Sequence, residues 1–193
     1  MSLSFLLRAA APYLAVGIVM GVFHNAWLAI LVYHLQIVVW AVLTMPKLRF
    51  RVGARELLWA AASVVTGPLI YVLLPHVISL ELSDWLLRNS ITKTHLAILI
   101  PYYGILHPFL EQVHWAPLRR AHPSSHLLFS GYHILVLASL FTAPWLMATF
   151  VSLAVVSAFW LYLEKRLGGL GAPFISHAFA DLGMVIAAWF RFQ

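Results

Sequence analysis

Hydrophobic residues run through the chain in long stretches that are separated by short polar breaks. A helix needs about 20 mostly apolar residues to cross the hydrocarbon core of a bilayer, which is about 30 Å thick. We count seven such stretches, at 4–23, 26–45, 57–74, 94–116, 125–142, 144–163 and 173–190. The pattern therefore predicts an all-α, polytopic membrane helix bundle of about seven transmembrane helices, with residues 1–193 forming a single integral membrane domain.

Polar and helix-breaking residues mark where these spans end or bend. His24 and Asn25 form the only polar break in the first 45 residues, so they predict a turn between two spans. Pro101 and Pro108 lie inside the fourth span and predict a kink, because proline removes a backbone hydrogen bond of the helix. The connection 75–93 mixes apolar residues with acidic ones, which is typical of an amphipathic segment on the outer membrane surface.

The composition narrows the chemistry that this protein can perform. Hydrophobic residues make up 63% of the chain and charged residues 9%, whereas soluble domains carry roughly a quarter charged residues. A water-soluble globule is therefore excluded. Cysteine is absent, which excludes disulfides, thiolate nucleophiles, cysteine-ligated zinc and iron–sulfur clusters. The chemistry is left to oxygen groups and to imidazoles, of which the chain has ten.

The 12 Lys and Arg residues are distributed unevenly between the two sides of the predicted bundle. The side of the N-terminus has nine, Arg8, Lys47, Arg49, Arg51, Arg55, Arg119, Arg120, Lys165 and Arg166, and the opposite side has three, Arg88, Lys93 and Arg191. This bias predicts a cytoplasmic N-terminus in the cytoplasmic (inner) membrane of a prokaryote. The basic residues lie in short loops with no module for nucleic acid, so the expected partner is the lipid bilayer.

Four of the ionisable residues inside the predicted spans converge at one depth: Glu111, His133, His177 and Asp181. Such residues are costly in a bilayer and usually face the interior of the bundle, where they mark functional sites. At about 1.5 Å per residue, they lie roughly 6–12 Å from the cytoplasmic ends of three different helices. His177 and Asp181 are four residues apart and therefore share a helix face. This arrangement predicts one site that opens toward the cytoplasm.

Two motifs in the second half of the chain connect these residues to a known family. Phe129-Ser-Gly-Tyr-His133 has the form F-x-x-x-H, and His177-Ala-Phe-Ala-Asp181 has the form H-x-x-x-D after one intervening span. In order, spacing and span placement, residues 109–183 resemble the CAAX-protease and bacteriocin-processing (CPBP or Abi) family of intramembrane endopeptidases. We therefore expect residues 94–193 to be a CPBP-like catalytic core, and residues 1–93 to be N-terminal spans of unrecognised type.

The first motif of that family, E-E-x-x-x-R, is altered in this chain. Its positions read Glu111-Gln112-Val113-His114-Trp115-Ala116, so the second glutamate and the arginine are both missing. The resemblance implies that Glu111 and His133 activate water, and that His177 and Asp181 stabilise the oxyanion. It also implies supporting positions at Gln112, His114 and Phe129.

These residues predict a glutamate-dependent intramembrane endopeptidase that needs no cofactor and cleaves a membrane-associated protein or peptide. Glu111 fits the general base, since a buried carboxylate in a low-dielectric cavity can accept a proton from water. An ionised Asp181 would repel the oxyanion, so we expect it to act through His177 by orienting that ring. Replacing Asp181 with Asn should then be milder than replacing it with Leu.

Two alternatives remain open. Glu111-x-x-His114 has the spacing of a di-iron carboxylate helix, and His122 and His126 are four residues apart, so metal is not excluded; a second Glu-x-x-His is missing, however. Loss of activity with a strong chelator, restored by added metal, would identify such a metal enzyme. The altered first motif instead favours a catalytically degenerate membrane subunit or assembly factor, in which Glu111→Gln would change no phenotype.

Overall fold

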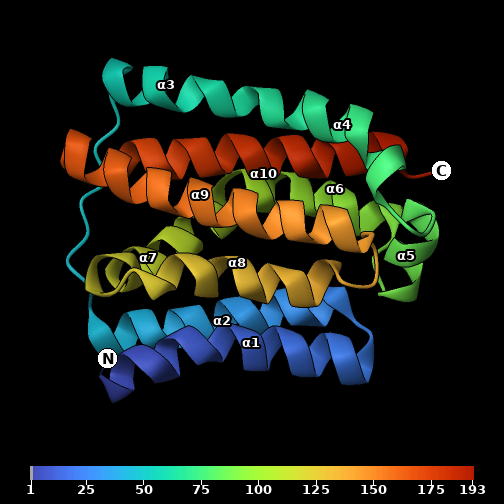
Figure 1. Ribbon diagram of the computed structural model, residues 1–193, viewed down its shortest axis with the longest axis horizontal. Helices are drawn as coiled ribbons and strands as arrows, with labels where there is room; N and C mark the ends of the chain where they lie inside the picture. The colour runs from blue at the N-terminus through green and yellow to red at the C-terminus, as the bar shows by residue number, and fades with distance from the viewer. Residues whose placement is uncertain (1) are drawn as a thin grey trace.

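The computed structural model describes residues 2–193, and within that range it is helical with no strand. The helices lie side by side along one long axis, with the two chain termini at opposite ends (Figure 1). In chain order they are α1 (Leu3–Phe23), α2 (Ala26–Thr44), α3 (Ala54–Ala60), the 3₁₀ turn η1 (Ala61–Val65), α4 (Thr66–Val77), α5 (Leu82–Arg88), α6 (Lys93–Pro101), the π-helical turn η2 (Tyr102–Leu106), α7 (His107–Ala121), α8 (Ser124–Leu137), α9 (Ala143–Leu167) and α10 (Gly171–Arg191). The all-α prediction is confirmed.

Five segments are long and apolar enough to cross a membrane: α1, α2, Ala54–Val77, α9 and α10. Such helices fit an integral membrane protein. The remaining two predicted spans correspond to 93–121, which a π-helical turn interrupts, and to α8, which has 14 residues. Both segments are helical and pack within the bundle, but neither is among the helices that are long and apolar enough to cross a membrane.

The predicted turn between the first two spans is confirmed. His24 ends α1 in the left-handed conformation with φ 47°, which reverses the direction of the chain. Asn25 then begins α2, and its side-chain oxygen accepts a hydrogen bond of 2.8 Å from the backbone N–H of Leu28. Asparagine is one of the strongest helix N-cap residues, so this short polar break ends one helix and starts the next.

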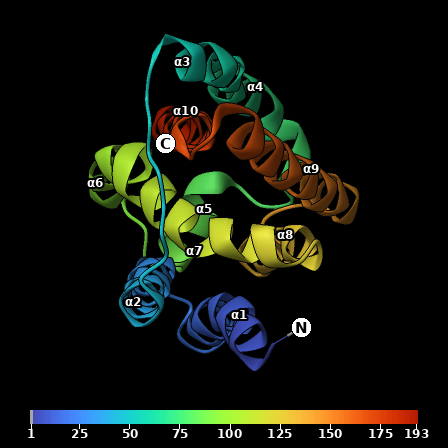
Figure 2. The same ribbon diagram turned by 90° about the vertical axis from the view of Figure 1, so that its left-hand side faces the viewer.

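An extended segment, residues 45–53, closes the end of the bundle that holds the N-terminus. Figure 2 shows it passing across this end, from α2 to α3. The backbone N–H of Leu170 donates to the carbonyl oxygen of Arg49 at 2.7 Å. A Cβ on Gly171 would lie 1.7 Å from the carbonyl oxygen of Arg51, so only glycine fits there. The α9–α10 turn is thereby fixed to the segment, and the start of α10 is positioned.

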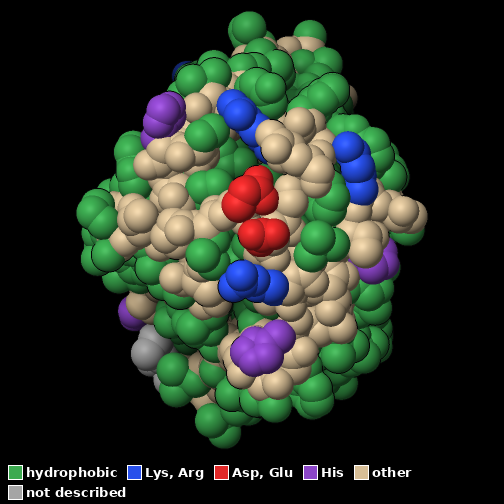
Figure 3. Space-filling view, turned by 90° about the vertical axis from the view of Figure 1, so that its right-hand side faces the viewer, with side chains coloured by type: hydrophobic (Ala, Val, Ile, Leu, Met, Phe, Trp, Pro, Cys, Tyr) green, Lys and Arg blue, Asp and Glu red, His purple; other side chains and the backbone are tan. Residues whose placement is uncertain are grey.

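The short helix α5 covers the opposite end of the bundle, as expected for an amphipathic segment. Trp85 and Leu86 are buried, and the indole N–H of Trp85 donates to the Ser139 hydroxyl at 2.8 Å. Glu81 caps the helix by accepting from the backbone N–H of Ser83 at 2.6 Å. Figure 3 shows this end of the molecule, where acidic side chains lie between basic ones and hydrophobic groups surround them.

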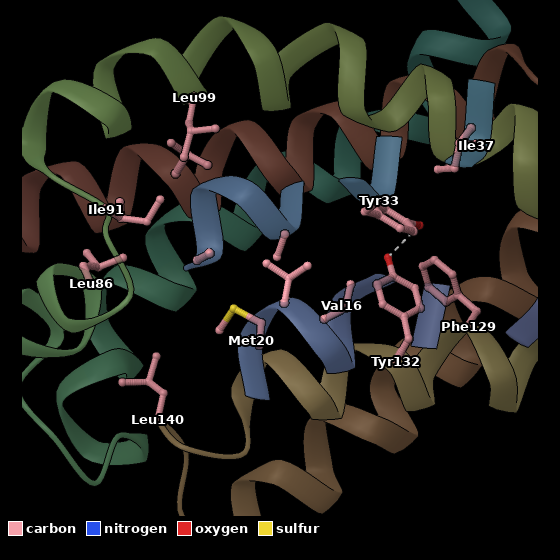
Figure 4. Packing of buried hydrophobic residues seen from close by; sticks show 14 of the residues in the cluster. Val16, Met20, Tyr33, Ile37, Leu86, Ile91, Leu99, Phe129, Tyr132 and Leu140 are labelled. Carbon is pink, nitrogen blue, oxygen red and sulfur yellow. Dashed lines mark hydrogen bonds between the residues drawn. The ribbon is translucent and has the colours of Figure 1, made fainter. Parts of the chain in front are cut away.

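The buried core lies between α1, α2, α8 and the ends of the neighbouring helices (Figure 4). Val16 and Met20 of α1 are buried here. Tyr33 of α2 and Tyr132 of α8 point toward each other in Figure 4, and their hydroxyl oxygens are 3.2 Å apart. Buried hydroxyls need polar partners, and those of these two tyrosines lie at the candidate site.

Candidate functional site

Helices α7 and α10 bring three of the four predicted catalytic residues together. His177 Nε2 lies 3.5 Å from Glu111 Oε2 and 3.2 Å from Asp181 Oδ2. The Glu111 residue is 1% exposed. Two carboxylates and an imidazole, from helices far apart in sequence, therefore form one polar cluster in the interior of the bundle.

His107 is a fourth member of this cluster, and the motif analysis missed it. Its Nε2 lies 3.8 Å from Glu111 Oε1 and 3.5 Å from Asp181 Oδ2. The spacing of His107 and Glu111 on α7 repeats that of His177 and Asp181 on α10, since each histidine precedes its acid by four residues. This repeated spacing is visible in the sequence and could have identified His107 as a site residue.

The irregular turn before α7 positions His107. The predicted kink is found between Pro101 and Pro108, where the helix changes to π-helical geometry over Tyr102–Leu106 and the backbone N–H of His107 donates to the carbonyl oxygen of Tyr102. Single π-helical turns occur often at functional sites. His107, the residue that enters the cluster, follows this turn directly.

Two tyrosines hold one oxygen of the Glu111 carboxylate. The hydroxyls of Tyr33 and Tyr132 both donate to Glu111 Oε1. The indole N–H of Trp115 donates to the Tyr33 hydroxyl at 3.1 Å and supports it from behind. Glu111 Oε2 has no hydrogen-bond partner among the described residues. The carboxylate is thus fixed through one oxygen, and the other faces His177.

A chain of hydrogen bonds fixes the tautomer of His107. His34 Nδ1 lies 2.7 Å from the carbonyl oxygen of Ile30 and also 2.7 Å from the Tyr102 hydroxyl. Because a carbonyl only accepts, His34 Nδ1 carries the proton and its Nε2 is an acceptor. His107 Nδ1, which lies 2.8 Å from that Nε2, must therefore be the donor. The lone pair of His107 Nε2 consequently points toward Asp181 and Glu111.

His133 lies beside the cluster and is separated from it. Its Nδ1 lies 2.8 Å from the carbonyl oxygen of Phe129, and its ring centroid is 4.0 Å from that of Tyr132. Within residues 2–193, it makes no hydrogen bond or ion pair with Glu111 or His177. Tyr132 therefore lies between His133 and the carboxylates, and the role of His133 in water activation stays a prediction. Phe129 is buried in the core.

Gln112 connects the cluster to a buried arginine. The Gln112 side-chain oxygen accepts a hydrogen bond from Arg119, and its amide nitrogen lies 3.5 Å from His177 Nδ1. Arg119 had been counted with the basic residues of the loops, yet it is 2% exposed. A guanidinium therefore does lie beside the second position of the altered motif. The family pattern expects an arginine at the position of Ala116, and Arg119 lies three residues after it.

Among the described residues, the histidines of the metal alternative do not come together with Glu111 in a ligand set. His114 faces α1, where its Nε2 lies 3.1 Å from the carbonyl oxygen of Arg8. His122 pairs with the Ser124 hydroxyl, and His126 lies 3.0 Å from the Ser157 hydroxyl.

A different set does come together in the described structure. His107, Glu111 and His177 each offer a ligand atom, and these atoms all lie within 4.8 Å of one another.

Comparison with known proteins adds no assignment. No protein-family model matches the chain, no curated protein is detectably similar to it, and no solved structure matches its fold. The functional argument therefore depends on the chemistry of the cluster.

Proposed function

We propose that this protein is an intramembrane endopeptidase in which Glu111 activates water to cleave a peptide bond of a membrane-associated protein or peptide. The observation that carries the proposal is the asymmetric environment of the Glu111 carboxylate: tyrosine hydroxyls hold one oxygen, and the other accepts no hydrogen bond from the described residues and faces His177 at 3.5 Å. A general base needs a fixed position and an oxygen free to take the proton. The test compares the protein termini that form in cells carrying the parent protein with those that form in cells carrying Glu111→Gln.

The other residues of the cluster supply the remaining parts of such a reaction. Tyr33 and Tyr132 orient the base. His177 forms the electrophilic side, because its Nε2 lies 3.5 Å from Glu111 Oε2, and a low-dielectric site strengthens its effect on a developing oxyanion when that nitrogen carries a proton. Asp181, 3.2 Å from the same nitrogen, acts through His177. His133 lies behind Tyr132, so its part in the reaction stays a prediction.

Substrate access requires movement, since Glu111 is almost fully buried. The π-helical turn is the place for it, because a helix that already departs from α geometry has fewer regular hydrogen bonds to lose. Gly104 in this turn packs against Leu182, where an added Cβ would lie 3.3 Å from Cδ1 of that side chain. A shift of the turn away from α10 would open a path to the cluster.

A catalytically inactive membrane subunit is the second candidate. Two observations favour it: the burial of Glu111 and the presence of Gln112 where the family has a second glutamate. The endopeptidase and the inactive subunit would have the same fold. They differ only in whether Glu111 is required for peptide cleavage.

We also propose that the chain crosses the inner membrane of a prokaryote seven times, with a cytoplasmic N-terminus. The supporting observation is that the segment 45–53 and the α7–α8 and α9–α10 turns, which contain or adjoin most of the basic residues, lie at the same end as the N-terminus (Figures 1 and 2). Segments 93–121 and 124–137 are then the fourth and fifth spans.

Cysteine labelling tests this topology, because the chain has no cysteine of its own. Ala121→Cys should react only from the cytoplasmic side, as should the control Lys47→Cys, while Arg88→Cys should react from outside. If 93–121 and α8 did not cross, Ala121→Cys would react from the same side as Arg88→Cys. The measurement is labelling of intact cells with a membrane-impermeant maleimide.

Asp181 offers a test of how the acid acts. Asp181→Asn keeps an oxygen near His107 and His177, whereas Asp181→Leu removes it and leaves both rings without a polar partner on that side. We expect the Asn variant to retain substantially more cleavage than the Leu variant, measured as the yield of the substrate terminus at equal protein levels. An equal loss in both would show that the charge of Asp181 is required.

A further inference from the structure

We propose that a basic pocket at the ends of α7 and α9 binds a phosphate group, and that in the membrane this group belongs to the headgroup of an anionic phospholipid. The basic pocket is a cavity of about 250 Å³ at the end of the bundle that holds the N-terminus (Figure 1). Its walls are Lys47 and Arg49 of the segment 45–53, Arg120 of α7, and Glu164, Lys165 and the glycine pair 168–169 at the end of α9. None of these residues belongs to the Glu111 cluster, so the inference is independent of the proposed endopeptidase.

Positive charge is in excess in the basic pocket. Four of its lining residues are cationic, and the one acid, Glu164, pairs with Arg120. Within residues 2–193, the side chains of Lys47, Arg49 and Lys165 form no ion pair. Like charges that converge on one cavity repel one another. A bound phosphate group would replace this repulsion with attraction.

Arg120 presents an oriented guanidinium to the basic pocket. Its Nε and Nη2 both donate to Glu164 Oε1, and the Glu164 side chain is itself only 8% exposed. Arg120 Nη1 makes no hydrogen bond with the described residues, so its two N–H groups are available to a ligand. Planar guanidinium groups are well suited to phosphate oxygens, and this one is held in place by a buried partner.

The backbone around the basic pocket is fixed by its own contacts. The N–H of Leu170 donates to the carbonyl oxygen of Arg49 at 2.7 Å, and a Cβ on Gly169 would lie 2.8 Å from the same oxygen. Gly168 ends α9 in the left-handed conformation with φ 74°, and a Cβ on it would meet no atom within 4 Å. The turn is therefore joined to the segment 45–53 while it leaves space open. A site that is already formed loses less entropy when a ligand binds.

The size and place of the basic pocket favour a lipid headgroup over a complete soluble ligand. Pockets that enclose drug-sized ligands measure about 300–1,000 Å³, which is more than this cavity holds. Helix α9 has 25 residues and, at about 1.5 Å per residue, is longer than the hydrocarbon core. Its last turn, which carries Lys165, therefore lies at headgroup depth. Basic pockets between membrane helices are known to bind anionic headgroups there.

The outer face of α9 offers a path for the acyl chains of such a lipid. Tyr162 precedes Lys165 by three residues, and Phe159 precedes Tyr162 by three, so the three side chains follow one another along the helix surface. Tyr162 is 50% exposed and Phe159 is 40% exposed. A lipid with its phosphate at Lys165 would thus lay its chains along exposed aromatic side chains.

Lipid binding to the purified full-length protein tests the proposal. The protein in a neutral detergent is titrated with phosphatidylglycerol, and bound lipid is counted by native mass spectrometry. We expect one molecule to bind more tightly than phosphatidylcholine with the same acyl chains, since the phosphate of phosphatidylcholine carries its own cation. The double variant Lys47→Gln/Lys165→Gln should bind phosphatidylglycerol about 25-fold more weakly, from about fivefold for each basic residue near an anionic headgroup.

The double variant Arg55→Gln/Arg166→Gln is the matched control. It removes the same charge from exposed residues at the same end of the bundle that do not line the basic pocket, and it should bind like the parent. Phosphatidylglycerol should also raise the unfolding temperature of the parent and of the control, but not that of the pocket variant. Unchanged binding in the pocket variant, equal weakening in both variants, or equal binding of the two lipids would overturn the proposal.

Competition with a soluble phosphate ester distinguishes the two sources of the phosphate group. Glycerol 3-phosphate lacks the acyl chains that would lie along α9, so we expect it not to displace phosphatidylglycerol at millimolar concentrations. Displacement by glycerol 3-phosphate at the concentrations at which the lipid binds would support the phosphate site and overturn its assignment to a lipid.

Discussion

The Glu111→Gln protein is expected to produce none of the substrate termini that the parent protein generates in its membrane. Glutamine has the shape of glutamate and can still accept hydrogen bonds from Tyr33 and Tyr132, but it cannot take a proton from water. Loss of a general base typically costs 10²–10⁴-fold in rate. The measurement is a mass-spectrometric comparison of protein termini in membranes from cells that carry the parent, the variant or neither.

Glu81→Gln is the matched control for this experiment. It makes the same chemical change at the exposed end of the molecule, where the amide oxygen can still cap α5. Parent-like termini in the control and their absence in Glu111→Gln would support the base. The same termini in Glu111→Gln and the parent, with both proteins folded, would contradict it and favour the inactive subunit.

The Gly183→Ala protein is expected to lose much of its stability. Gly67 of α4 and Gly183 of α10 meet where the two backbones touch: a Cβ on Gly183 would lie 2.7 Å from Gly67 Cα and 2.8 Å from its nitrogen. Small residues at such crossings allow membrane helices to pack closely. Overpacking usually costs about 1–3 kcal/mol, and here the cost should reach at least the upper end, since backbone cannot move aside as a side chain can.

Thermal unfolding in detergent measures this effect, with Gly21→Ala as the control because a Cβ there meets no atom within 4 Å. Gly183→Ala should unfold at a clearly lower temperature than the parent, and Gly21→Ala should not. An unchanged unfolding temperature for Gly183→Ala would mean that the two helices are not held in contact at this crossing.

The positions of most helices could be predicted because each apolar stretch is bounded by polar or helix-breaking residues. The His24–Asn25 turn is an example, since an asparagine N-cap acts within a few residues of itself. Part of the site was predictable for a similar reason. Ionisable residues are rare in membrane spans, so depth alone brought Glu111, His177 and Asp181 together.

The rest of the site depends on helix rotation and on contacts between distant helices. Tyr33 and His34 reach the cluster from α2, and nothing in the sequence relates either residue to Glu111. His133 was placed at the correct depth, but its side chain lies behind Tyr132, and depth does not determine the direction in which a residue points. Arg119 was taken for a loop residue because its partner, Gln112, lies almost two helical turns away.

The π-helical turn at Tyr102–Leu106 also sets the register of a whole helix. Such a turn holds one residue more than α geometry allows, and one residue corresponds to a rotation of about 100° about the helix axis. Buried Leu96 and Leu99 on one side of it, and Glu111 on the other, face the interior together only because of that extra residue. The number of residues between Pro101 and Pro108 is therefore constrained more tightly than their identities. We therefore expect Ile105, which is well exposed, to tolerate replacement by another apolar side chain but not deletion.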